Sequence, residues 1–198
     1  RDLHSFPTRR SSDLQQKSTR SAANGEPNDP GFTSQWHYRN LGEGNYDFEN
    51  LNNNKVGAKA GCDVNALEAW KTCKGDPSII VAILDEGVMY THPDLAANMW
   101  CNPGESVQGA QTDGDGNGYE GDLHGYNFVT ESGDITWTDA NDTGHGTHVA
   151  GTIAAVNNNG IGVSGVAGGD GTPNSGVKIM SCQVFSGQNS VTLAGEAR

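Results

Sequence analysis

The sequence predicts an α/β domain built around a mainly parallel sheet. Residues 78–84 form a continuous run rich in β-branched side chains, which is typical of a strand covered on both faces. Residues 149–155 form a run of small apolar residues, which indicates a tightly packed helix. The 198 residues are 34% hydrophobic and 18% charged and include 28 glycines, a composition that suits one loop-rich globular domain.

The first thirty residues are expected to lie outside that domain. Residues 2–14 resemble the in-frame translation of a common sequencing-library adapter, so residues 1–14 are set apart from the fold. On that view the natural start of the protein, with any signal peptide, lies upstream. Residues 15–30 are polar with two prolines and are expected to form a linker or an extended arm. The folded domain is expected over residues 31–198.

A short amphipathic helix is predicted over residues 63–71. Asp63 is the expected cap, Leu67 and Trp70 are the apolar positions, and residues 75–77 end the segment.

Asp85 follows the predicted strand 78–84 directly. In open α/β sheets the carboxyl ends of the strands are where ligands and catalytic groups collect, so Asp85 is a candidate functional residue. Taken alone, residues 85–87 favour a simple turn over a functional site.

Two histidines stand at the start of the predicted small-residue helix. His145 and His148 are three residues apart, whereas a zinc-binding pair on a helix is spaced by four residues with a glutamate between, so a metal site is disfavoured. Gly144 and Gly146 leave room for another chain segment to lie close. We expect His145 to be exposed at the helix start and His148 to be packed inward as a structural residue.

Charge and cysteine content narrow the function classes. Twelve basic and twenty-four acidic residues give a formal net charge of −12, which argues against a nucleic-acid surface and favours solubility or cation binding. The longest apolar run, residues 79–84, is far shorter than the roughly 20 residues of a membrane span. No CxxC spacing occurs, so the cysteines either form disulfides in one of three pairings or stay free and buried. They are Cys62, Cys73, Cys101 and Cys182.

Two motifs together resemble the aspartate and histidine regions of the subtilases, the subtilisin-like serine proteases. They are IVAILDEGV at residues 80–88, with HPDL at 92–95 downstream, and GHGTHVAG at residues 144–151. The similarity runs from about Asn28 to Arg198 and includes the arm-like segment 29–36 and the strand-like segment 177–181. It implies a three-layer subtilisin-like fold, of which this chain holds the N-terminal portion of the catalytic domain while the C-terminal half is missing.

The resemblance implies a serine-type endopeptidase that hydrolyses extended polypeptides through an Asp/His/Ser triad. Asp85 would orient the imidazole of His145, and His145 would take the proton of the serine hydroxyl and pass it to the leaving amine. The nucleophilic Ser and the oxyanion Asn are expected beyond residue 198, so the fragment is not expected to be active as given. The expected partners are a polypeptide substrate and an N-terminal propeptide outside this chain, and the expected location is secreted, cell-surface or periplasmic.

Glu86 departs from the family pattern, because many subtilases have Ser or Thr directly after the catalytic Asp. A carboxylate pointing at His145 would raise the pKa of the imidazole. We expect Glu86 to point to solvent instead, since successive residues of a strand project to opposite sides.

Calcium is the expected cofactor, and an acidic loop at residues 113–122 is the first candidate site. Its oxygen-bearing residues alternate and a glycine stands at the sixth position, as in an EF-hand loop, although His124 occupies the twelfth position. The candidate ligands are Asp113, Asp115, Asn117 and Asp122. A merely solvated acidic turn is the alternative.

The resemblance implies a second calcium site. It would join Asp94 to the loop after the histidine helix, through Asn158 and carbonyl groups near Val156, Ile161 and Val163. Residues 157–160 are one residue longer than in subtilisin, which leaves open which asparagine binds the ion. The alternative to a protease is a catalytically dead, calcium-binding interaction protein on the same fold.

Overall fold

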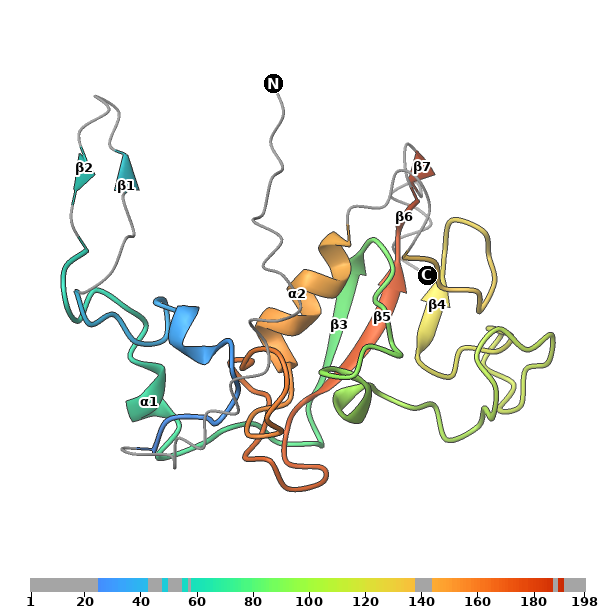
Figure 1. Cartoon of the computed structure of the whole chain (residues 1–198). Coiled ribbons are helices and arrows are strands. Elements are labelled where there is room, and N and C mark those ends of the chain that lie inside the picture. Colours follow the sequence, from blue (N-terminus) through green and yellow to red (C-terminus); the bar gives the residue numbers. More distant parts are fainter. Residues whose placement is uncertain are drawn as a thin grey trace, which may run out of the picture.

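The computed structural model describes residues 25–42, 48–49, 55–56, 58–137, 144–186 and 189–190 (Figure 1). The predictions for residues 1–14, and for most of the linker or arm at 15–30, lie outside the described residues.

A three-stranded parallel sheet is the centre of the fold. It consists of β3 (Ile80–Asp85), β5 (Lys178–Gln183) and β4 (Gly125–Asn127), in the order β3-β5-β4. The register aligns Asp85 of β3 and Asn127 of β4 with the same residue of β5, Gln183. The predicted α/β fold with a mainly parallel sheet is confirmed, and the carboxyl ends of all three strands meet at one edge.

Helix α2 (His145–Ala154) covers one face of this sheet and runs alongside β3 (Figure 1). Ala150 and Ala154 are fully buried against Ile83 and Ile179, together with Val88 from the segment after β3. Because the buried positions of α2 carry alanine, the helix axis lies close to the strands, as the small-residue run predicts.

The other face of β3 differs from the expectation. The sequence predicts a strand covered on both faces, but Ile80 and Leu84 are 47% and 55% exposed, and Ala82 between them is exposed too. Alternate residues of a strand point to opposite faces, and α2 covers only the face that carries Ile83. Among the described residues the second face of β3 is therefore an open apolar surface.

A second, smaller core lies beside the sheet. It joins the 3-10 helix η3 (Phe32–Ser34) to α1 (Ala66–Ala69) through buried Phe32, Tyr38 and Trp70. The Trp70 indole N–H donates to the carbonyl oxygen of Val166 at 2.7 Å, which ties this cluster to the loops after α2.

Helix α1 is shorter than predicted, and Asp63 is not its cap. The helix begins at Ala66 after Asn65, which has a φ of 55° and makes no side-chain cap hydrogen bond. The carboxylate of Asp63 instead accepts the backbone N–H groups of Asn40 and Asn65, so it is already engaged in a turn before the helix begins.

The remaining elements are short. They are η4 (Ala96–Asn98), the antiparallel pair β1 (Phe48–Glu49) and β2 (Lys55–Val56), and the antiparallel pair β6 (Phe185–Ser186) and β7 (Asn189–Ser190). All four cysteines are free, and the expectation that free cysteines are buried is wrong for the three that are exposed. No helix in the described part of the chain is long and apolar enough to cross a membrane.

Candidate active site

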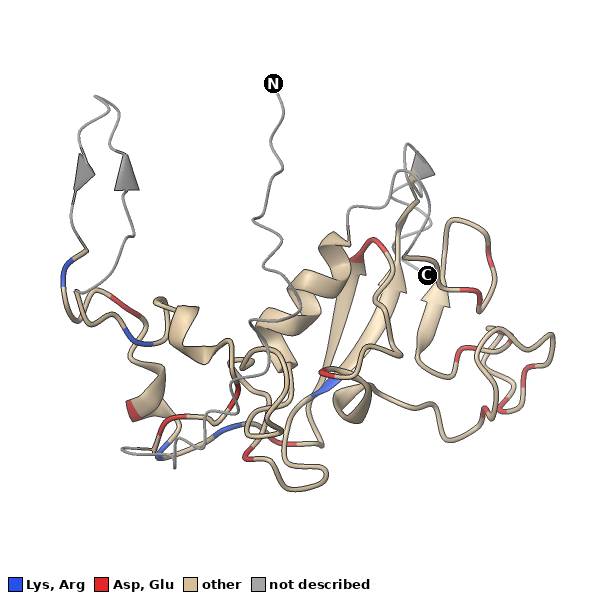
Figure 2. Cartoon of the chain, in the orientation of Figure 1, with Lys and Arg blue, Asp and Glu red and all other residues tan. Residues whose placement is uncertain are grey.

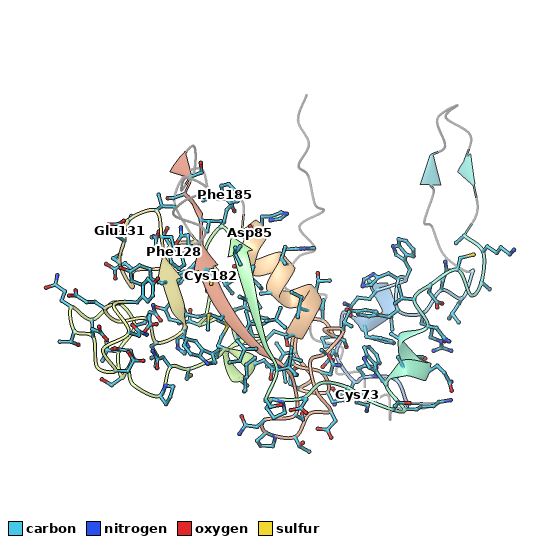
Figure 3. The ribbon with its side chains drawn as sticks, turned by 180° about the vertical axis from the view of Figure 1, so that it is seen from behind. Cys73, Asp85, Phe128, Glu131, Cys182 and Phe185 are labelled. Atoms are coloured by element: carbon cyan, nitrogen blue, oxygen red, sulfur yellow. The ribbon has the colours of Figure 1, made fainter. Side chains whose placement is uncertain are left out.

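The site begins where β3 ends. Asp85 is the last residue of the strand, and its carbonyl oxygen accepts the backbone N–H of Val184 at 2.9 Å. Its carboxylate accepts the N–H of Glu86 at 2.7 Å, so the chain turns away from strand geometry at this point. The carboxylate is largely shielded, with 16% of the side chain exposed. Figure 3 shows Asp85 at the end of β3, beside the start of α2.

The first turn of α2 rests on the bend that follows Asp85. Gly144, the N-cap residue, has a φ of 73°, a conformation that glycine adopts without strain. A Cβ atom on Gly146 would lie 2.2 Å from the carbonyl oxygen of Glu86, so no larger residue fits there without displacement. The hydroxyl of Thr147 accepts the N–H of Met89 at 2.9 Å. These contacts fix where the helix starts.

His145 is the first residue of α2 and contacts Asp85 directly. Its Nδ1 lies 2.8 Å from both carboxylate oxygens of Asp85. An ionised carboxylate can only accept, so Nδ1 carries the proton that is donated to Asp85. The His145 side chain is 64% exposed, which leaves Nε2 free to meet a reacting group. Asp85 raises the pKa of His145, first through the hydrogen bond and then through its charge, and Glu86 adds a smaller effect in the same direction.

Glu86 does not point away from this pair, and that expectation is wrong. Its Oε2 accepts the backbone N–H of His145 at 3.2 Å. The expectation assumed strand alternation, but β3 ends at Asp85 and the alternation ends with it.

The prediction that His148 packs inward is also wrong, because His148 is exposed. Residues three apart lie on the same helix face, and His148 therefore shares the exposed face of His145. The buried face of the helix carries Ala150 and Ala154 instead.

The structure brings part of the acidic loop together. Glu105, Asp113 and Asp115 each offer a carboxylate oxygen, and these oxygens lie within 4.8 Å of one another. Glu105 was not foreseen, because it lies outside the alternating motif and no spacing rule connects it to the loop. Several acidic residues lie along the loops between η4 and β4, as Figure 2 shows in red.

Asn117 and Asp122 lie beside this cluster. The amide of Asn117 donates to Asp115 at 3.3 Å and to Asp122 at 3.1 Å, and Asp122 is buried. The imidazole of His124, at the twelfth position, is held by the carbonyl oxygen of Trp100 at 2.7 Å. The all-oxygen set Glu105, Asp113 and Asp115 fits a hard cation such as Ca²⁺.

Asp94, in the segment between β3 and η4, is buried against the loop that follows α2. Its carboxylate accepts the side-chain amide of Asn159 at 2.7 Å and the backbone N–H of Val163 at 2.9 Å. The N–H of Val156 donates to the main-chain oxygen of Asp94. Burial raises the pKa of Asp94, and the charge of nearby Asp29 adds to the increase.

Asn158 is not the asparagine that meets Asp94. Its side chain accepts the N–H of Asn28 and donates to the carbonyl oxygen of Asp170, so it faces the N-terminal segment. Asn159 lies next to Asp94 instead. The side chain of Ile161 is exposed, and its N–H donates to Asn159.

Sequence reasoning missed Asp29. This buried carboxylate accepts the hydroxyl of Ser164 at 2.7 Å and backbone N–H groups of the loop 158–160. A single Asp in a polar, proline-containing segment carries no sequence signal for such a role.

Comparisons with known proteins find similar sequences and structures. The family model described as "Subtilase family" matches residues 76–197. "Subtilisin-like protease 1" of Plasmodium berghei (strain Anka) is 40% identical over 102 residues, which cover 52% of this chain and 15% of that protein. "Extracellular basic protease" of Dichelobacter nodosus is 35% identical over 157 residues, which cover 72% of this chain and 21% of that protein.

Among solved structures, the serine protease of Aeromonas sobria is similar, alone and in complex with a chaperone, ORF2. In each case the TM-score is 0.57 and the identity 26%, over 96% of this chain and 25% of that one. The chain thus spans about a sixth to a quarter of the length of these relatives.

The two glycines inside α2 give a matched pair of variants. Gly146→Ala should destabilise the fold and separate His145 from Asp85, because the new Cβ would overlap the carbonyl oxygen of Glu86. Gly151→Ala meets no atom within 4 Å and should stabilise the helix by about 0.5–1 kcal/mol. Thermal melts compare the melting temperatures of the two variants. Equal changes would contradict the close packing of Gly146 against the carbonyl oxygen of Glu86.

Asp85→Asn should lower the pKa of His145, because the substitution removes the charge that favours the protonated imidazole. The folded pKa of His145 is raised, so the pair stabilises the fold below about pH 6.5 and this contribution is lost as the pH rises through the folded pKa. The unfolding free energy lost in Asp85→Asn should therefore be larger near pH 5.5 than near pH 8.5. Imidazole NMR titration checks the pKa, and an unchanged His145 titration would refute the prediction.

Proposed function

The chain belongs to the subtilase family, and on that premise we propose that it is the N-terminal part of the catalytic domain of a serine-type endopeptidase. The substrate is an extended polypeptide, and the reaction is hydrolysis of its peptide bonds. One observation carries the proposal: the exposed imidazole of His145 is held by its Nδ1 at 2.8 Å from both oxygens of Asp85.

The proposed chemistry follows from the two ends of the imidazole. Asp85 keeps the proton on Nδ1, so that Nε2 of the exposed imidazole has a free electron pair. Nε2 takes the proton of a serine hydroxyl as the oxygen attacks the scissile carbonyl carbon, and the imidazolium then protonates the leaving amine. Asp85 stabilises the imidazolium that exists between these two transfers. In this proposal a serine and an asparagine that binds the oxyanion complete the site.

Location and partners are proposed from the relatives. The Dichelobacter nodosus relative is named an extracellular protease, which supports secretion of this protein as well. The Aeromonas sobria protease was solved in complex with a chaperone, which supports a partner that assists folding, such as a propeptide.

We propose Ca²⁺ as the cofactor, at one or both of the acidic sites. Glu105, Asp113 and Asp115 would supply hard oxygen ligands at the first site. Asp94 would anchor the second site, where nearby Asp29 adds a second buried carboxylate. Bound calcium would neutralise these carboxylates and hold the loops together, and it takes no part in proton transfer.

His145 and His148 allow a test of the triad in the full-length protein, because both are exposed on one face of α2. His145→Ala should lower kcat for peptide hydrolysis by roughly 10⁴-fold or more. His148→Ala should change it little. A serine-directed fluorophosphonate should label the wild type and much less of His145→Ala. If the full-length protein has the nucleophilic serine and both variants hydrolyse peptides equally well, the triad is refuted. If another residue stands in place of that serine, the alternative of a catalytically dead, calcium-binding interaction protein is favoured.

Calcium removal should destabilise the protein. A ligand present at about 100 times its Kd stabilises the folded state by about 2.7 kcal/mol, so a chelator should lower the melting temperature. Asp113→Asn should reduce this chelator effect, because it removes a carboxylate of the cluster. Glu120→Gln removes the same charge from an exposed position of the loop outside the cluster and should leave it unchanged. Identical melts with calcium and with chelator would count against the cofactor.

A further inference from the structure

Helix α2 begins without a cap of its own. Its N-cap residue is Gly144, which offers no side chain, and its first turn contains no acidic residue. The first four N–H groups of a helix have no partner within the helix, and side-chain acceptors usually satisfy some of them. Here an acceptor comes from a segment 59 residues earlier: Oε2 of Glu86 accepts the N–H of His145 at 3.2 Å.

Glu86 thus holds the start of α2 by two kinds of contact. Its side chain accepts from the backbone of His145, and its main-chain carbonyl oxygen lies against Gly146, the next residue of the helix. A negative charge at a helix N-terminus is also favoured by the helix dipole. Glu86 also contacts the other residue of the pair, because its backbone N–H donates to the carboxylate of Asp85.

Resting on the proposed protease function, we propose that Glu86 is a positioning residue of the active site: it caps α2 from outside the helix and holds the His145 imidazole against Asp85. The position that carries Ser or Thr in many subtilases thus carries a charged group that contacts the backbone of the histidine itself.

The negative charge of Glu86 raises the pKa of His145. Among the described residues, the charged groups that act on His145 are Asp85 and Glu86, at the end of β3 and in the bend after it. His148 is the titratable residue one turn along the same helix, and β5 presents uncharged Gln183 beside Asp85. The pKa of His145 is raised, chiefly by Asp85 and further by Glu86. Catalysis needs the unprotonated imidazole, so a higher pKa moves the acidic limb of the activity profile to higher pH.

Three variants separate the hydrogen bond from the charge. Glu86→Gln keeps an acceptor oxygen at nearly the same place but removes the charge. Glu86→Ala removes both. Glu68→Gln removes one charge from α1, where Glu68 pairs with Lys71, and controls for the change in net charge.

In the full-length protein, Glu86→Gln should lower the pKa of His145 in an NMR titration and move the acidic limb of kcat/KM to lower pH by the same amount. The shift should shrink at high salt, because the charge is exposed to screening. Glu86→Ala should in addition lower kcat/KM by about three- to tenfold near neutral pH, as expected for loss of a helix cap. Glu68→Gln should match the wild type in both measurements.

An unchanged His145 titration in Glu86→Gln, together with wild-type kcat/KM in Glu86→Ala, would overturn the proposal. If Glu86→Ala fails to fold, Glu86→Gln still decides, because it retains the acceptor. The NMR titration needs no enzymatic activity. A shifted His145 pKa in a protein without hydrolysis would therefore uphold the role of Glu86 and refute only the proposed protease function.

Discussion

The close approach between the start of α2 and the bend after β3 is the contact on which the site depends. Asp85 is placed by the sheet and His145 by the helix, so their 2.8 Å contact exists only if the two elements meet at one fixed distance. Gly146 permits that distance by having no side chain, and Thr147 fixes the rotation of the helix through its bond to Met89. Backbone packing, more than the Asp85–His145 attraction itself, aligns the pair, because an ion pair whose imidazole is 64% exposed contributes little stability.

Polar residues stand side by side at the carboxyl ends of the three strands. Gln183 aligns with Asp85 on one side and with Asn127 on the other, and both amide side chains are almost completely buried. Buried amides are stable only when bonded. Gln183 accepts the N–H of Thr136 and donates to its hydroxyl, while Asn127 donates to the carbonyl oxygen of Asp134. These bonds anchor the segment that passes beside the bend and limit how far the carboxyl ends of the strands can move.

The sequence predicts those parts of the molecule that follow from local patterns. The β-branched run before Asp85 and the small-residue run after His145 give the strand, the helix and their contact, because periodicity and residue size act within single elements. Two of the failures share a different cause. The side chains of Asp63 and Glu86 bond to distant or irregular backbone, and neither propensity nor strand alternation contains that information. Glu105 and Asp29 join their clusters only through the tertiary fold.

The N-terminal segment and the loop after α2 are joined by polar groups, and we propose calcium at these loops rather than at the Asp85–His145 pair. Asp29 and Asp94 are both buried, and their partners in the described residues are N–H and O–H donors rather than cationic side chains. Burial raises the pKa of Asp94, and the charge of neighbouring Asp29 adds to the increase, so the two carboxylates repel each other. A bound divalent cation would remove that repulsion. The Asp85–His145 pair needs no such ion, because the imidazolium supplies the positive charge when it forms.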